Sequence, residues 1–120
     1  MKFWSGVVSE KLQESKEFYV RLFGCEVAYD SEWFVLLQLG SSAIGFMQPG
    51  LEAQAPIFRS AFAGQGIWIT VDVEDVDAEY KRLTDMGVAL EVELRDESWG
   101  DRHFVVRDPN GIGVDIVQQR

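Results

Sequence analysis

The most constraining feature of this sequence is one pattern that occurs twice. The first copy runs from Val8 to Gly24, and the second runs from Val73 to Gly87. In each copy an alternating apolar segment leads into a helical pattern, which begins at a capping residue and stops at a glycine. We therefore expect two similar half-domains that enclose a pocket between them.

Strand and helix signals predict the order βαβββ in both copies. The first half has predicted strands over 3–8, 25–29, 33–39 and 43–48, with a helix over 10–23 that Ser9 caps. The second half has predicted strands over 67–73, 88–94, 102–106 and 112–117, with a helix that Asp75 caps and Gly87 closes. The expected fold class is α+β, with tandem βαβββ modules forming a curved mixed sheet around a concave cleft. One domain is expected, with modules at 1–48 and 66–120 joined by a connector at 49–65.

The charge balance restricts the partners of this chain. The formal net charge is -9, with 20 acidic and 11 basic residues. Nucleic acid is not expected as a partner, because phosphate binding needs clustered Lys and Arg. The acidic balance would attract a cationic ligand, although it is also typical of a soluble surface.

The lone cysteine and the hydropathy pattern bear on location. Cys25 has no partner within the chain, so no internal disulfide is expected, and this suits a reducing cytosol. No apolar run approaches the ~18 residues of a membrane span, and the first residues enter an alternating pattern directly. We expect a cytoplasmic protein that neither binds nor crosses a membrane.

Strand alternation assigns side chains to the concave face. Matching Val8 to Val73 places Phe3, Ser5 and Val7 of the first strand there. The other strands contribute a longer set: Phe34, Leu36, Gln38, Gly45, Met47, Trp68, Thr70, Asp72, His103, Val105, Gly113 and Asp115. A register slip of one residue would reverse the assignment for a strand.

Several motifs together resemble a known family. They are the helix end from Phe18 to Gly24, the segment from Val73 to Ala78, and Trp99-Gly100-Asp101-Arg102-His103-Phe104 before Asp108-Pro109-Asn110-Gly111. Their order resembles the glyoxalase / bleomycin resistance / dioxygenase superfamily, also called vicinal oxygen chelate, over essentially the whole chain. One such fold hosts lyases, isomerases, dioxygenases and non-catalytic drug binders, so the resemblance predicts the fold more specifically than the function.

The resemblance also implies where metal ligands would lie. Metal-using members carry His, Gln or Glu on the first, fourth, fifth and eighth strands, and this chain has Phe3, Gly45 or Met47, Trp68 and Asp115 there. Aromatic rings and glycine supply no nitrogen or oxygen ligand, so we expect no metal and no cofactor. An unorthodox site of His103 and Asp115 with Asp72 or Gln38 stays open.

The aromatic substitutions lead to our main functional prediction. We expect a metal-free small-molecule binding protein of the bleomycin-resistance type that sequesters a cationic or aromatic ligand, such as an antibiotic, as a homodimer. The predicted ligand-binding residues share the concave face or its rim: Phe3, Ser5, Phe34, Leu36, Gln38, Met47, Trp68, Thr70, Trp99, His103 and Asp115.

Other functions stay open at this point. His103 and Asp115 on adjacent strands are weak catalytic candidates, and they would serve a lyase, isomerase or dioxygenase. The rings could instead fill the cleft, which would leave a sensing or protein-binding domain. The acidic run from Glu91 to Glu97 is interpreted as a solvated strand face leading to a loop.

Overall fold

The computed structural model describes residues 1–119, and within this range the chain forms two βαβββ modules. The first contains β1 (Ser5–Val8), α1 (Leu12–Phe23), β2 (Glu26–Asp30), β3 (Phe34–Leu39) and β4 (Ser42–Met47), followed by the 3₁₀ turn η1 (Pro56–Phe58). The second contains β5 (Trp68–Asp72), α2 (Val76–Asp85), β6 (Leu90–Asp96), β7 (Asp101–Arg107) and β8 (Gly113–Gln119). The chain divides into two compact units, and the second begins at Gly64.

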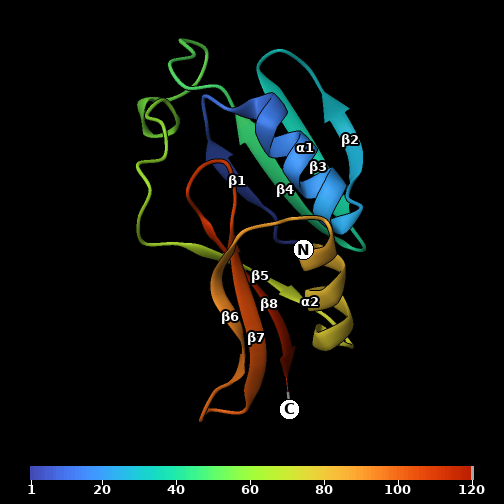
Figure 1. Cartoon of the computed structure of the whole chain (residues 1–120). Helices are drawn as coiled ribbons and strands as arrows, with labels where there is room; N and C mark the ends of the chain where they lie inside the picture. The colour runs from blue at the N-terminus through green and yellow to red at the C-terminus, as the bar shows by residue number, and fades with distance from the viewer. Residues whose placement is uncertain (120) are drawn as a thin grey trace. The chain divides into compact units, whose positions relative to one another are not determined.

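Each module forms one four-stranded mixed sheet (Figure 1). The strand orders are β1-β4-β3-β2 and β5-β8-β7-β6, in which the first pair is parallel and the other pairs are antiparallel. The chain between the two parallel strands of each module contains the helix and the other two strands, which gives the long connection that a parallel pairing requires. The predicted α+β class with tandem βαβββ modules is confirmed.

Helix α1 covers one face of the first sheet through a predicted apolar stripe. Leu12, Ser15, Tyr19 and Leu22 are all buried, as their helical spacing requires. The helix begins two residues later than predicted, because the Ser9 hydroxyl accepts the Lys11 N–H at 2.9 Å in a turn that precedes it. It ends as predicted at Gly24, whose φ of 68° is one that glycine adopts without strain.

Helix α2 covers one face of the second sheet in the same way. Asp75 caps it as predicted, since Oδ1 accepts the Ala78 N–H at 3.1 Å. Val76 and Leu83 are fully buried, and the helix packs on β7 and β8. Tyr80 places its ring edge on fully buried Phe104, with 5.3 Å between the ring centroids. We call the opposite surface of each sheet its helix-free face.

The first strand differs from its prediction by one residue. Ser9 N–H bonds the Met47 carbonyl at 2.8 Å, and Val73 N–H bonds the Val117 carbonyl at 2.9 Å, so Ser9 rather than Val8 corresponds to Val73. Val7 pairs with fully buried Phe46 and is only 5% exposed on the side of α1. The assignment of Ser5 and Val7 to the opposite face is therefore wrong. A short strand with two adjacent valines leaves the register open by one residue.

The turn between β7 and β8 fixes the register of the last strand. Buried Asp108 accepts the N–H groups of Asn110 and Ile112 through Oδ1, at 2.8 and 2.9 Å. Gly111 follows with φ of 83°, which favours glycine at this position of the predicted turn. This register leaves Val114 and Ile116 buried and turns Asp115 to the helix-free face.

Among the described residues no helix is long and apolar enough to span a membrane.

Candidate functional site

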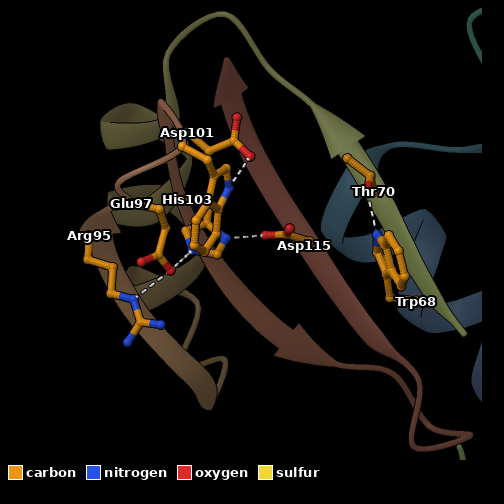
Figure 2. A network of polar contacts seen from close by, with 8 residues as sticks. Trp68, Thr70, Arg95, Glu97, Asp101, His103 and Asp115 are labelled. Carbon is orange, nitrogen blue, oxygen red and sulfur yellow. Dashed lines mark hydrogen bonds and ion pairs between the residues drawn. The ribbon is translucent and has the colours of Figure 1, made fainter. Parts of the chain in front are cut away.

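The sole histidine of the chain lies between two carboxylates (Figure 2). His103 Nδ1 is 2.6 Å from Asp115 Oδ1, and Nε2 is 2.8 Å from Glu97 Oε2. All three side chains are largely buried, with exposed fractions of 10% for His103, 13% for Glu97 and 25% for Asp115. Arg95 extends the network, because its Nε donates to the same Glu97 oxygen at 2.9 Å.

Backbone pairing brings these groups together. Asp115 pairs with Val105, so His103 is its diagonal neighbour on the same face of β7 and β8. Glu97 follows β6 in a tight turn, in which its N–H bonds the Asp101 carbonyl at 2.8 Å and its carbonyl accepts the Gly100 N–H at 3.1 Å. The turn thus places the Glu97 carboxylate on the free side of the imidazole.

The two carboxylates change the acid–base properties of His103. Burial alone would lower the pKa of this imidazole, but the hydrogen bonds to Glu97 and Asp115 outweigh burial and raise the pKa above its ordinary 6.5. The pKa of Glu97 is lowered from 4.5, first by its bond to His103 and then by its bond to Arg95. The arrangement therefore favours the protonated ring of His103 over the neutral one.

The contact between His103 and Asp115 was predicted from the sequence, but the role of Glu97 was not. The acidic run up to Glu97 was interpreted as a solvated strand face, and this is wrong for its last member. The sequence signal that could have revealed the role of Glu97 is Gly100. A glycine three residues after Glu97 indicates a turn, and this turn pairs residue 97 with residue 101, two positions before His103.

Trp68 and Thr70 form a second contact on the same sheet face. The Trp68 indole Nε1–H donates to Thr70 Oγ1 at 3.0 Å, which links two side chains on the same side of β5 (Figure 2). Trp68 is nevertheless 71% exposed. Its ring is therefore oriented by the sheet while most of its surface stays accessible.

Trp99 lies in the turn between β6 and β7. Its Nε1–H donates to Asp101 Oδ2 at 2.9 Å, and its ring meets the His103 ring edge-on at a centroid distance of 6.5 Å. The indole remains mostly exposed. Trp99 therefore adds an accessible aromatic surface to the network around His103.

The helix-free face of the first sheet carries an aromatic group instead of a polar one. Phe34, Leu36 and Met47 lie there with Gln38, as predicted. A side chain on Gly45 would come within 2.9 Å of Trp4 Cζ3 and 3.0 Å of Phe34 Cε2. The Trp4 and Phe34 rings meet at 6.3 Å, so the missing side chain of Gly45 makes room for this pair.

The corrected register changes which residues correspond in the two modules. Trp4, not Phe3, corresponds to Trp68, since both stand five residues before the matched Ser9 and Val73. Gly45 likewise corresponds to Asp115. Phe3 precedes β1 and is 92% exposed, and Ser5 lies on the face towards α1, so neither belongs to the predicted wall.

Comparison with known proteins gives the family. The family model described as Glyoxalase/Bleomycin resistance protein/Dioxygenase superfamily matches residues 4–116. The chain belongs to this superfamily. An uncharacterized protein of Mycobacterium bovis is 38% identical over 52 residues, which is 43% of this chain. The match spans about a third (34%) of that curated relative's length.

Three solved structures show the same fold. A lactoylglutathione lyase from Agrobacterium tumefaciens superposes with a TM-score of 0.80 at 22% identity, over 98% of this chain and 92% of that one. TioX from Micromonospora sp. ML1 gives 0.77 at 21% identity over all of both chains. A bleomycin-binding protein complexed with bleomycin gives 0.72 at 16% identity, over 100% and 99% of the two chains.

The residues of this superfamily member do not fit a divalent metal at the expected positions. Those positions hold Trp4, Gly45, Trp68 and Asp115, and Asp115 alone carries a ligand atom. His103 offers no ring nitrogen in this arrangement because both are bonded to carboxylates. Asp72 of the alternative site instead accepts from Gln119 Nε2 at 3.2 Å. Within residues 1–119 no group of three His, Cys, Asp or Glu is placed to hold a metal.

Proposed function

We propose that this superfamily member is a metal-free small-molecule binding protein of the bleomycin-resistance type, which sequesters a cationic or aromatic ligand. The observation that carries the proposal is the substitution of Trp4, Gly45 and Trp68 at three of the four positions where metal-using relatives carry ligands. Indole rings cannot coordinate a metal, but they stack on flat molecules and attract cations.

The surroundings of Trp68 support this proposal. The bond to Thr70 orients the indole, so little side-chain entropy remains to be lost when a ligand stacks on it. The net charge of -9 favours the approach of a cation. Oriented aromatic surface together with a negative field suits a flat cation better than a neutral or anionic ligand.

An enzyme using His103 and Asp115 is the second candidate, and the 2.6 Å contact between them favours it. Such an enzyme needs one imidazole nitrogen that is accessible to its substrate. Here Nε2, the nitrogen that Asp115 does not contact, is hydrogen-bonded to Glu97. Stoichiometric Zn, Ni, Fe or Mn in the purified protein that a His103→Ala variant loses would support the enzyme and contradict the binding protein.

Tryptophan fluorescence tests the binding proposal. We expect bleomycin-class glycopeptides or intercalating antibiotics to quench or shift the emission of micromolar protein in a saturable way. Trp68→Ala should weaken the binding, and Trp33→Ala, which removes another half-exposed indole outside the predicted set, should not. No response to any member of the panel would contradict the proposal.

The proposal includes a homodimer in the cytoplasm, where sequestration would confer resistance to an antibiotic. Exposed Phe3, Ile57 and Phe58 offer apolar surface that a subunit contact would bury. The buried, unpaired thiol of Cys25 suits a reducing compartment. Sedimentation velocity at tens of micromolar should show a dimer, and a monomer alone would contradict this part.

A further inference from the structure

We propose that the helix-free face of the second sheet has a notch above Gly113 that binds the protonated amine of an aromatic ligand. Asp115 would supply the anion and Trp68 the stacking ring. This inference rests on the proposed binding function and specifies the ligand group that this sheet recognises.

The notch follows from the strand register. Trp68 is the partner of Gly113, and Thr70 is the partner of Asp115 on the neighbouring row. Gly113 has no side chain, and an added Cβ would meet only Val105 Cγ1, at 3.8 Å. The surface between the Trp68 ring and the Asp115 carboxylate is therefore free of the side chain that a strand residue would normally place there.

Asp115 has one oxygen committed to the protein and one available. Its Oδ1 contacts His103, while no described residue bonds to its Oδ2. A quarter (25%) of the side chain is exposed, so a ligand can reach this oxygen. Because the contact with His103 fixes the plane of the carboxylate, Oδ2 is a preorganised acceptor for an N–H donor of the ligand.

Trp68 and Thr70 complete the recognition. The indole donates to Thr70 Oγ1, which leaves the hydroxyl hydrogen of Thr70 available for a ligand acceptor. In the register Trp68 lies one row from Asp115, and 71% of its surface is exposed. An aromatic frame can stack on Trp68 while its amine meets Asp115.

The cationic groups near the notch are each paired with a carboxylate, and the His103 ring lies between Asp115 itself and Glu97. Arg107 is opposite Gly113 in the register, but its guanidinium is bound to both oxygens of Glu91, at 2.7 and 3.2 Å. Arg95 is similarly bound to Glu97. The second oxygen of Asp115, Oδ2, has no partner among the described residues, and we assign it as the acceptor for the amine of the ligand.

Titration calorimetry with two matched probes tests the notch, and the whole 120-residue chain is used. 1-Naphthylmethylamine, protonated at pH 7, and neutral 1-naphthalenemethanol share one aromatic frame and differ in charge. We expect the amine to bind about tenfold more tightly, the difference that a charge-assisted hydrogen bond supports. Asp115→Asn should remove this preference by weakening the binding of the amine, whereas Asp72→Asn on the same face should retain the preference.

Variants that fill the notch with a side chain form the second part of the test. Gly113→Ala should weaken the binding of both probes, and Gly113→Val should weaken it further. Circular dichroism would establish that each variant is folded. Equal binding of the two probes, or a preference that survives Asp115→Asn, would overturn the amine notch but leave the binding proposal standing. Binding of no probe and of no antibiotic in the panel would overturn both.

Discussion

His103 Nδ1 lies 2.6 Å from Asp115 Oδ1, and this contact joins two strands of the second sheet diagonally on its helix-free face. Because Glu97 occupies the other ring nitrogen, the imidazole is better placed to orient its neighbours than to exchange protons with a substrate. The contact therefore favours a fixed binding surface over acid–base catalysis.

The first prediction concerns the dependence of stability on pH. Since the pKa of His103 is raised in the folded protein, its contribution is fully present below its ordinary 6.5 and is lost as pH rises through the folded value. Urea unfolding between about pH 5.5 and 8.5 should show the free-energy advantage of the wild type over His103→Gln shrinking as pH rises. A free-energy difference that stays constant with pH would contradict the ion pairs of His103 with Glu97 and Asp115.

The second prediction concerns Glu97, whose side chain accepts from both His103 and Arg95. Replacing it by Gln removes one of the two anions beside the imidazole, so the pKa of His103 should fall. Because the chain has a single histidine, its ring-proton NMR signal reports this pKa directly. Glu91→Gln, which breaks only the exposed pair with Arg107, is the control and should leave the His103 titration unchanged.

The third prediction concerns Gly45. A methyl group there would lie 2.9 Å from Trp4 and 3.0 Å from Phe34, so Gly45→Ala should displace the Trp4 ring and destabilise the protein by about 1–3 kcal/mol. Gly6→Ala is the control, because its added carbon would meet only the Gly45 carbonyl at 3.8 Å. An unchanged Trp4 indole NMR signal in Gly45→Ala would refute the proposed packing.

The sequence predicted the fold well where one periodicity dominates. The stripe of Leu12, Tyr19 and Leu22 specifies a helix face over three turns, and Asp75 and Gly24 mark helix ends through local hydrogen bonds and backbone preference. Alternation of Val114, Asp115 and Ile116 likewise gave the correct faces in β8. These signals act within one element and need no knowledge of its partners.

The site was predicted less completely because its details depend on pairing between elements. Val7 and Val8 suit either face of a short strand, so only the bonds to β4 determine that Trp4 corresponds to Trp68. Glu97 reaches His103 through a turn, and the amino-acid composition does not reveal the geometry of that turn. The packing of Trp4 into the space left by Gly45 also follows from register, not from either residue alone.

The most direct test of ligand binding uses the indole N–H signals of the four tryptophans in a ¹⁵N-labelled protein. A planar aromatic cation, N-methylquinolinium, would be titrated into the wild type, with the Trp68 signal assigned from Trp68→Phe. We predict a saturable shift of the Trp68 signal while the Trp33 signal stays in place. A Trp68 signal that does not move at millimolar cation, or a shift confined to Trp33, would contradict an aromatic binding surface on the second sheet.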